Sequence, residues 1–411
     1  MTEEACREID SCRVCESDAL YSFLDLGDQP PANAFVDDPG EDEPAYPLEV
    51  VVCETCDHVQ LAHTVDSEIL FTDYPYYSSA SQPLFDHFGA YADAVQQRYL
   101  DVGDLVVEIG CNDGVLLGQF DESIRTVGVD PADNVTEEAR NRGVDIVTAL
   151  FRPDVAASIH DDFGDAAAIC ANNVVGHIDD LYGLMTGVDT LLGPDGVFVV
   201  EVPYLVDLLS NNQFDTIYHE HLSYFSVRAF QALVEQFDMQ VLDVNRMSVH
   251  GGTIRVHIQR ESAGRTPKRV VDDYRKLELA LSLDERTAYD EFAQQVERTR
   301  ERITTLLESL REDDSSVVGY AAPAKGNTLL NYCDIGPETL EYLIDTTPAK
   351  QGTYSPGTNI PVKKPAVFHE DAPEYAFLLA WNYKDAILKN EADYRESGGQ
   401  FVVPIPYVNI V

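Results

Sequence analysis

Runs of apolar residues recur along the central part of the chain, separated by polar and glycine-containing segments. Residues 105–110, 126–130 and 166–170 have the continuous apolar character of strands buried on both faces of a parallel sheet. A tight glycine turn follows the first of these strands, and a helix is predicted to begin there at Val115. A later strand is predicted at 197–201, after a Gly-Pro-Asp-Gly turn. The order of these elements predicts an α/β domain built on a parallel sheet.

The C-terminal half has a second strand, turn and helix pattern. After a hairpin-like stretch at 249–257, the segment 268–312 has the spacing of charged helices. Predicted strands at 316–320 and 341–345 flank a turn of small residues that contains Lys325. Such a turn at a helix N-terminus offers free N–H groups and a favourable dipole to an anion, although this sequence is not a Walker A loop. We therefore expect a second nucleotide-type α/β domain.

The N-terminal segment has little apolar sequence of its own but holds two CxxC pairs. These pairs are Cys12 with Cys15 and Cys53 with Cys56. Four thiolates suit tetrahedral zinc and leave no open position for substrate or water. We therefore predict a structural zinc site that stabilises this small segment. Three nearby residues are interpreted as bystanders, namely Cys6, His58 and His63.

The composition limits the partners that we expect. Among 411 residues, 72 are Asp or Glu and 28 are Lys or Arg, so the formal net charge is −44. A surface this acidic repels phosphate backbones and anionic membranes, which argues against nucleic acid or a membrane as a partner. Acidic residues dispersed among apolar segments are typical of halophilic proteins, in which concentrated salt screens self-repulsion. The chain lacks a run of ~20 apolar residues and a signal-peptide pattern, so we expect a cytoplasmic protein.

The turn after the first central strand carries candidate cofactor chemistry. It reads Glu-Ile-Gly-Cys-Asn-Asp-Gly over 108–114, and the next strand ends at Asp130, where a carboxylate can accept both ribose hydroxyls of a nucleoside. An NAD site favours GxGxxG, which holds a pyrophosphate at a helix N-terminus. Carboxylates beside the turn disfavour a pyrophosphate but tolerate a sulfonium and an amine. The pattern resembles motif I of class I S-adenosylmethionine-dependent methyltransferases.

A polar stretch after the later strand, Tyr-His-Glu-His at 218–221, could carry acid–base chemistry. Its histidines lie two residues apart, whereas the zinc-protease pattern HExxH places them on one helical face. A catalytic metal and a structural cluster are alternatives. We favour acid–base catalysis, because imidazole titrates near neutral pH and tyrosine can donate to a developing oxyanion. Tyr76 and His177 are further candidates, and each could instead be a packing or capping residue.

Several motifs together resemble one family. They are CRxC, CxxC, YxYxSS, ExGxNDG, YHEHLSYFS, HGGTIRVH, AxAKGNTLLNY and KQGxYxPGTxIPV, and they run from Cys12 to beyond Val362. The chain resembles the sugar C-methyltransferases of nucleotide-linked keto-hexoses and is similar to tetronitrose C-3 methyltransferase. The resemblance implies an α/β architecture of three domains: a small zinc-binding domain (1–70), a central class I methyltransferase (Rossmann-like) domain (71–246) and a second Rossmann-like α/β domain that helps to hold a sugar nucleotide (247–411).

The resemblance also implies roles for individual residues. A base removes the hydrogen at C-3, next to a 4-keto group, and the enolate attacks the methyl group of S-adenosylmethionine. His221 is implied as the base, and the implied residues around the sugar are Glu220, Tyr218, Tyr76 and His177. The implied cofactor contacts are Glu108, Gly110, Asn112, Asp113, Gly114, Asp130 and Asn172. The expected substrate contacts are His250, Lys325, Gly326 and Asn327.

Two other functions fit the same sequence features. One is an O- or N-methyltransferase of a related sugar or metabolite, which needs no acidic carbon. The other is a non-catalytic protein that binds sugar nucleotides. In each case we expect a small-molecule nucleotide sugar or metabolite as the partner, and a monomer or a weak homo-oligomer.

Overall fold

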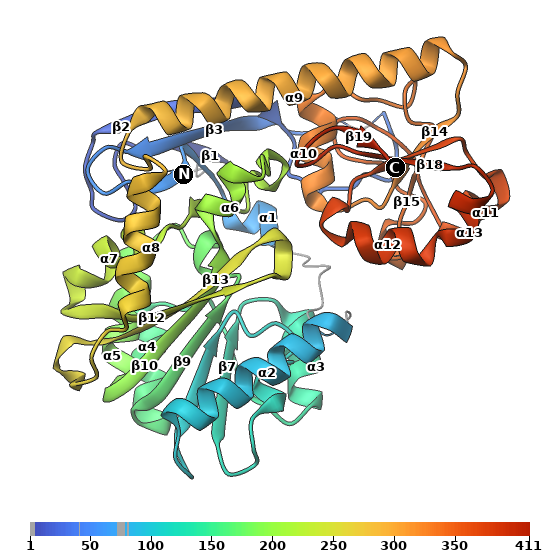
Figure 1. Cartoon of the computed structure of the whole chain (residues 1–411). Coiled ribbons are helices and arrows are strands. Elements are labelled where there is room, and N and C mark those ends of the chain that lie inside the picture. The colour runs from blue at the N-terminus through green and yellow to red at the C-terminus, as the bar shows by residue number, and fades with distance from the viewer. Residues whose placement is uncertain (1–4, 41, 72–78, 80–81) are drawn as a thin grey trace.

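Three larger sheets organise the computed structural model, which describes residues 5–40, 42–71, 79 and 82–411. A four-stranded sheet lies near the N-terminus, a seven-stranded sheet in the centre and a six-stranded sheet toward the C-terminus (Figure 1). The predicted α/β class with these three parts is confirmed. The domain boundaries stay a prediction, and one strand beyond residue 246 pairs within the central sheet.

The N-terminal sheet is antiparallel and has the order β11-β4-β3-β2. The N-terminal elements are β1 (Cys6–Glu8), β2 (Leu20–Gln29), β3 (Tyr46–Cys53), β4 (Val59–Leu61), β5 (His63–Val65) and α1 (Ser67–Phe71). The strand β11 (Ser223–Tyr224) comes from the middle of the chain, directly after the polar 218–221 stretch. The N-terminal part therefore holds one end of that stretch by backbone pairing.

The central sheet has the order β12-β13-β10-β9-β6-β7-β8. Its strands are β6 (Leu105–Ile109), β7 (Arg125–Asp130), β8 (Asp145–Thr148), β9 (Ala166–Asn172), β10 (Leu192–Pro203), β12 (Met239–Met247) and β13 (Thr253–Arg260). The first five are parallel, β13 pairs antiparallel with β10, and β12 pairs antiparallel with β13. The predicted strands are confirmed, and the Gly-Pro-Asp-Gly turn is an irregularity in register inside β10.

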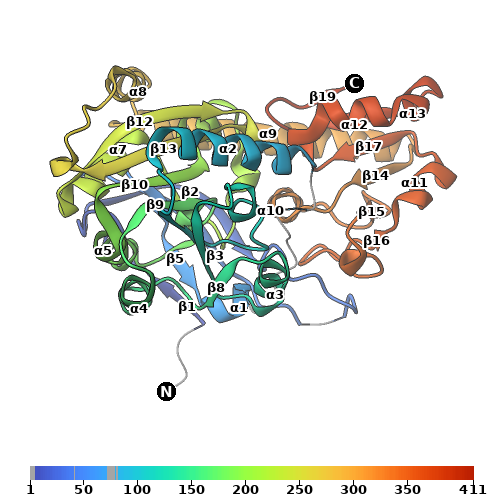
Figure 2. The same cartoon turned by 90° about the horizontal axis from the view of Figure 1, so that it is seen from below.

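Helices cover both faces of this sheet. They are α2 (Gln82–Tyr99), α3 (Asp133–Asn141), α4 (Pro153–Phe163), α5 (Leu181–Leu191), α6 (Leu205–Ser210) and α7 (Val227–Val234). Tyr91 of α2 packs with Val106 and Val199 on one face, whereas α4 and α5 pack with Val107 and Val200 on the other (Figure 2). Neighbouring residues of one strand point to opposite faces, so the two cores are separate.

The prediction that a helix begins at Val115 is wrong. The structure has only a short 3-10 turn, η2 (Leu117–Gln119), between β6 and β7. The apolar residues at 115–117 are buried, but they pack against α2, which already covers this face of the sheet. A side chain–backbone turn at Asp121 then returns the chain to β7 within a few residues, so no room is left for an α-helix.

The C-terminal sheet has the order β16-β15-β14-β17-β18-β19 and is parallel except for β19. Its strands are β14 (Val317–Tyr320), β15 (Leu343–Ile344), β16 (Val362–Lys363), β17 (Tyr375–Leu378), β18 (Gln400–Val403) and β19 (Asn409–Ile410). The helices that follow the central sheet are α8 (Arg269–Ala280), α9 (Arg286–Glu312), α10 (Ala324–Tyr332), α11 (Pro365–Asp371), α12 (Lys384–Asn390) and α13 (Ala392–Glu396). The long α9 runs along the N-terminal sheet to the C-terminal one (Figure 1).

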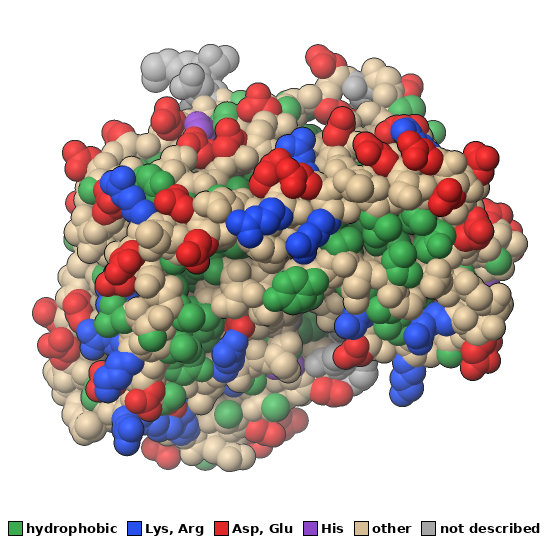
Figure 3. Space-filling view, turned by 45° about the horizontal axis from the view of Figure 1, so that its top comes forward, with side chains coloured by type: hydrophobic (Ala, Val, Ile, Leu, Met, Phe, Trp, Pro, Cys, Tyr) green, Lys and Arg blue, Asp and Glu red, His purple; other side chains and the backbone are tan. Residues whose placement is uncertain are grey.

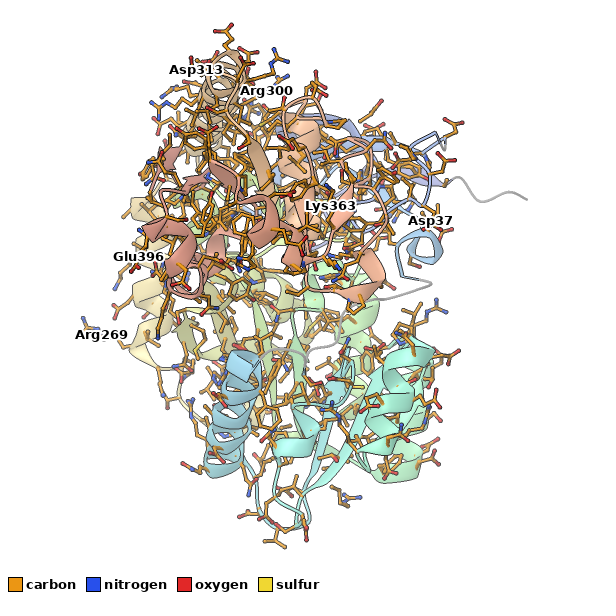
Figure 4. The ribbon with its side chains drawn as sticks, turned by 90° about the vertical axis from the view of Figure 1, so that its right-hand side faces the viewer. Asp37, Arg269, Arg300, Asp313, Lys363 and Glu396 are labelled. Atoms are coloured by element: carbon orange, nitrogen blue, oxygen red, sulfur yellow. The ribbon has the colours of Figure 1, made fainter. Side chains whose placement is uncertain are left out.

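Charged side chains are spread over the outside of the molecule. Acidic groups are scattered across the face in Figure 3, with Lys and Arg between them. The labelled Arg269 and Asp313 in Figure 4 lie at the periphery. Among the described residues, no helix is long and apolar enough to cross a membrane.

Candidate active site and zinc centre

A cleft of about 1550 Å³ lies where the three parts of the chain meet. The carboxyl ends of the parallel strands β6, β7 and β9 form one wall, and the loop at 216–224 forms another. The C-terminal part contributes the loop around Lys325, and the N-terminal part contributes Asn33. Ligands of open α/β sheets bind at this end of the strands, so the cleft has the position expected for an active site.

The cofactor wall is built on the predicted glycine turn. Gly110 has a φ of +67°, and a Cβ atom at this position would lie 2.7 Å from Val174 Cγ2, so only glycine fits. The Asp130 carboxylate accepts backbone N–H groups from Asn112 and Ala132, each at 3.0 Å. A carboxylate has further lone pairs, so Asp130 can still accept two ribose hydroxyls from the cleft side. Burial raises the pKa of Asp130.

Asn172, at the end of β9, also lines the cleft. Its side-chain amide donates to Glu108 Oε1 at 3.1 Å, and its own Oδ1 is buried without a hydrogen-bond partner. An unpaired acceptor at this wall fits a ligand that carries an amine or hydroxyl donor, as S-adenosylmethionine does. Glu108 lies just behind Asn172, and burial raises its pKa well above the ordinary range.

Three predicted cofactor residues lie outside the cleft lining, namely Glu108 behind Asn172, Asp113 and Gly114. Asp113 is fully buried and accepts hydrogen bonds from the Ser79 N–H and from Arg142. Gly114 has a φ of +72°, and its Cα faces Ala139 of α3. Both residues shape the turn from inside. Gly110, Asn112, Asp130 and Asn172 are the predicted cofactor residues that the structure brings to the cleft.

His221 lines the same cleft, in the loop at 216–224. Its Nδ1 is 2.7 Å from the Thr216 carbonyl oxygen, and because a carbonyl only accepts, Nδ1 carries the proton. The neutral ring therefore has its basic nitrogen at Nε2. The Tyr218 ring centroid lies 4.0 Å from that of His221, and the His177 centroid lies 5.0 Å from it. Burial and the neighbouring His221 hold the pKa of His177 well below its usual range.

Glu220 is buried beside His221 and is held by the N-terminal part. Asn33 Nδ2 donates to Glu220 Oε1 at 2.6 Å. Burial raises the pKa of Glu220 to about 7, against the opposing effects of the Asn33 hydrogen bond and the charge of Lys350. His219 points to the N-terminal part, where its Nε2 donates to the Tyr46 carbonyl oxygen at 3.1 Å.

Lys325 faces the cleft from the start of α10. Its Nζ donates to Asn382 Oδ1 at 2.5 Å and lies 3.8 Å from the Trp381 ring centroid. Burial lowers the pKa of Lys325 to about 8, partly offset by Asp215. The predicted contacts Gly326 and Asn327 lie outside the cleft lining, and Asn327 donates to the Ala32 carbonyl oxygen at 2.7 Å.

Sequence reasoning missed several cleft residues. They are Asn33, Asp179, Lys350, Asn382 and Tyr383. Lone polar side chains in small-residue segments, such as Asn33 in Pro-Ala-Asn-Ala, are a weak local signal at best. The side chains of two predicted site residues are not described by the structure. Tyr76 lies outside the described residues, and His250 lies in the 3-10 turn η6 (Val249–Gly251), with its side chain outside the description.

The four predicted zinc ligands come together in the N-terminal part. All four sulfur atoms lie within 4.8 Å of one another, with Cys12 and Cys56 at 3.7 Å and Cys15 and Cys53 at 3.5 Å. Tetrahedral zinc with bonds of about 2.3 Å requires sulfurs about 3.8 Å apart, so the donor set fits zinc. His58 instead contacts Ser223 Oγ at 3.1 Å.

Comparisons with known proteins cover the whole chain. Three protein-family models match this chain: a zinc binding domain at 12–71, a methyltransferase domain at 85–244 and a C-methyltransferase C-terminal domain at 248–406. C-methyltransferase NovU of Streptomyces niveus is 39% identical over 413 residues, covering 100% of this chain and 98% of that protein.

Two solved methyltransferase structures each match less than half of this chain. Magnesium protoporphyrin IX methyltransferase of Synechocystis PCC 6803 is 11% identical with a TM-score of 0.33, over 44% of this chain and 79% of that one. N-methyltransferase NodS of Bradyrhizobium japonicum WM9 is 12% identical with a TM-score of 0.32, over 44% of this chain and 98% of that one.

Proposed function

This chain belongs to the C-methyltransferase family that carries an N-terminal zinc-binding domain, and we propose that it methylates a carbon next to the keto group of a nucleotide-linked deoxysugar. It is an S-adenosylmethionine-dependent methyltransferase with a four-cysteine zinc site. Family membership decides against a non-catalytic binding protein and against O- or N-methylation. The methylated position that we propose is C-3, beside a 4-keto group.

The observation that carries this proposal is that His221 lines the same cleft as Gly110 and Asp130. S-adenosylmethionine supplies an electrophilic methyl group on a cationic sulfur when it is bound. His221 Nε2 takes the proton from the acidic carbon, and the electrons of that C–H bond form the enolate. The enolate carbon forms the new C–C bond to the methyl group, and the electrons of the broken C–S bond stay on sulfur.

The remaining residues of this wall have supporting roles in the proposal. The Thr216 carbonyl fixes the His221 tautomer, which keeps Nε2 ready to accept a proton. We assign Tyr218 and His177, whose rings lie next to that of His221, to donation to the enolate oxygen and to orientation of the sugar. Glu220 receives its hydrogen bond from Asn33, so we assign it to sugar hydroxyls in the cleft.

The C-terminal side of the cleft suits an anionic substrate end. Lys325 and Lys350 are the lysines of the cleft lining among the described residues, and Tyr383, which follows the Lys325 acceptor Asn382 in the chain, lines the same cleft. Two ammonium groups and an aromatic ring at one end of a cleft provide charge for a diphosphate and a surface for a base. We therefore assign this end to the nucleotide.

Mass spectrometry of products tests the proposal. The protein is incubated with methyl-labelled S-adenosylmethionine and a panel of 4-keto and fully reduced sugar nucleotides in concentrated KCl. The expected product gains one labelled methyl group on carbon, only from keto substrates. In deuterium oxide without cofactor, the C-3 hydrogen of the keto substrate should exchange. Methylation of oxygen, or equal turnover of reduced sugars, would contradict the proposal.

We also propose that the acidic surface is an adaptation to concentrated salt. The support is the net charge of −44 and the scattered placement of the carboxylates (Figure 3). The melting temperature in calorimetry should rise between 0.1 M and 3 M KCl. A melting temperature that falls or stays constant would contradict this proposal.

A further inference from the structure

We propose that Arg13, which lies between the two cysteines of the first zinc pair, is a positioning residue for the active-site cleft. It holds Asp179 and thereby the turn that carries His177. This inference rests on the proposed function for the role of His177. The zinc-binding domain would then help to organise the active site through Arg13. The metal itself, enclosed by four thiolates, does not contact the cleft.

The Arg13 side chain is 4% exposed, and each of its three guanidinium nitrogens donates a hydrogen bond. Its Nε donates to Asp179 Oδ1 at 2.9 Å, and its Nη2 donates to Thr64 Oγ1 at 2.7 Å. Its Nη1 donates to the Leu61 carbonyl oxygen at 2.7 Å and to Gln60 Oε1 at 3.2 Å. Since Cys12 and Cys15 flank it, the zinc ligands fix the backbone from which this planar fork extends.

Asp179 lies two residues after His177 and lines the cleft. Thr64 Oγ1 also donates to Asp179 Oδ1, at 3.1 Å, and Arg7 forms an ion pair with Oδ2. The preceding residues form the 3-10 turn η3 (Val175–His177), and α5 begins at residue 181. Asp179 lies between this turn and the helix in the chain. Because its carboxylate is fixed by the zinc-binding domain, it sets where the His177 ring lies relative to His221.

The same zinc-domain residues also reach the other catalytic wall. Gln60, which accepts from the Arg13 backbone N–H at 3.0 Å, pairs in register with Ser223 of β11. The Leu61 N–H donates to the Leu222 carbonyl oxygen at 3.0 Å, next to His221. The turn with His177 and the loop with His221 are therefore both attached to the strand segment that Arg13 bridges.

A second arginine pair provides a matched control. Arg228 of α7 donates to Asp57, the residue after Cys56, with its Nε 2.9 Å from Asp57 Oδ2. This pair also joins the zinc-binding domain to the central domain, but neither residue lines the cleft. Loss of either pair removes one interdomain ion pair, whereas only loss of the Arg13 pair should disturb the cleft.

The test compares Arg13→Gln, Arg13→Lys, Asp179→Asn and Arg228→Gln in the full-length zinc-loaded protein. Zinc content is measured by mass spectrometry, S-adenosylmethionine affinity by calorimetry and amide exchange by hydrogen–deuterium mass spectrometry. Arg13→Gln and Asp179→Asn should keep one zinc and unchanged cofactor affinity. Amides at 174–181 should exchange about tenfold faster or more, and kcat should fall about 10- to 100-fold with little change in KM. Arg13→Lys should recover part of kcat.

Arg228→Gln should change neither the exchange at 174–181 nor kcat by more than about twofold, because neither Arg228 nor Asp57 lines the cleft. Equal effects of Arg228→Gln and Arg13→Gln would overturn the proposal, because general loosening of the domain interface would then suffice. Unchanged exchange in Asp179→Asn, which leaves the zinc pair intact, would overturn it as well. The exchange measurement needs no substrate, so it gives its answer even if the proposed sugar substrate is incorrect.

Discussion

The buried carboxyl of Glu220 should make the stability of this protein depend on pH in a way that one substitution removes. Glu220 is 3% exposed and receives a hydrogen bond from Asn33. Glu220→Gln keeps the shape and an acceptor for Asn33 but has no charge at any pH. The two proteins therefore differ mainly in what ionisation of residue 220 costs the folded state.

The size of the effect follows from the two pKa values. Burial raises the pKa of Glu220 from 4.5 to about 7. Between these values the folded chain keeps a proton that the unfolded chain has released, so the free energy of unfolding falls as the pH rises through this window. The folded and unfolded pKa values of Glu220 differ by about 2.5. Since each pKa unit corresponds to about 1.4 kcal/mol, the free energy of unfolding falls by about 3 kcal/mol in total. The full decrease in the free energy of unfolding is reached above pH 7, and there is no decrease below pH 4.5.

Urea denaturation at constant KCl, at pH 5 and pH 8, measures this difference. The chain has a single tryptophan, Trp381, whose fluorescence can be followed together with circular dichroism. Glu220→Gln should match the wild type within about 1 kcal/mol at pH 5 and exceed it by about 3 kcal/mol at pH 8. The control Glu370→Gln changes an exposed carboxylate on α11 and should follow the wild type. Parallel pH dependence of the wild type and Glu220→Gln would refute the reasoning.

Three further substitutions test the cofactor wall, the base and the zinc centre. His221→Asn should lower kcat about 10²- to 10⁴-fold without changing the calorimetric affinity for S-adenosylmethionine, and a normal kcat would remove this residue from the base role. Gly110→Ala should weaken cofactor binding about tenfold or more, because its Cβ atom would lie 2.7 Å from a valine side chain. The control Gly164→Ala also has positive φ but open space, and should bind the cofactor normally. Replacing Cys12 and Cys53 together by Ser should reduce the measured zinc from one per chain to near zero, and retained zinc would contradict the four-thiolate site.

The parts of the fold that the sequence predicts are those encoded by neighbouring residues. Residues 105–107 of β6 and 127–129 of β7 are apolar or glycine on both faces of the strand, and such runs are typical of strands inside a covered parallel sheet. The helix predicted at Val115 has the same apolar character, but its residues fill space against α2. Local sequence reports that a segment is buried, whereas the identity of the element that covers it comes from distant parts of the chain.

The same distinction applies to the site. The cysteine pairs and the glycine turn are recognisable because each needs fixed residue types at short spacing, whereas the role of His221 rests on the family resemblance and stays a prediction. Asn33 and Glu220 are 187 residues apart, and Arg13 and Asp179 are 166 apart. These partners meet only because β11 joins the N-terminal sheet, which brings the zinc-binding domain against both catalytic walls. No pattern within either segment encodes that pairing.

The distribution of charge inside the cleft gives a physical reason for the order in which the two proposed ligands lie. The cofactor wall ends in Asp130. The loops of the C-terminal part bring Lys325 and Lys350 to the same cleft, in a chain whose net charge is −44. Concentrated salt screens distant surface carboxylates but not groups within a few ångströms in a partly enclosed cleft. Under the proposed function, a cationic sulfonium therefore lies toward Asp130 and an anionic diphosphate toward the two lysines, which leaves the sugar ring for the part of the cleft that His221 lines.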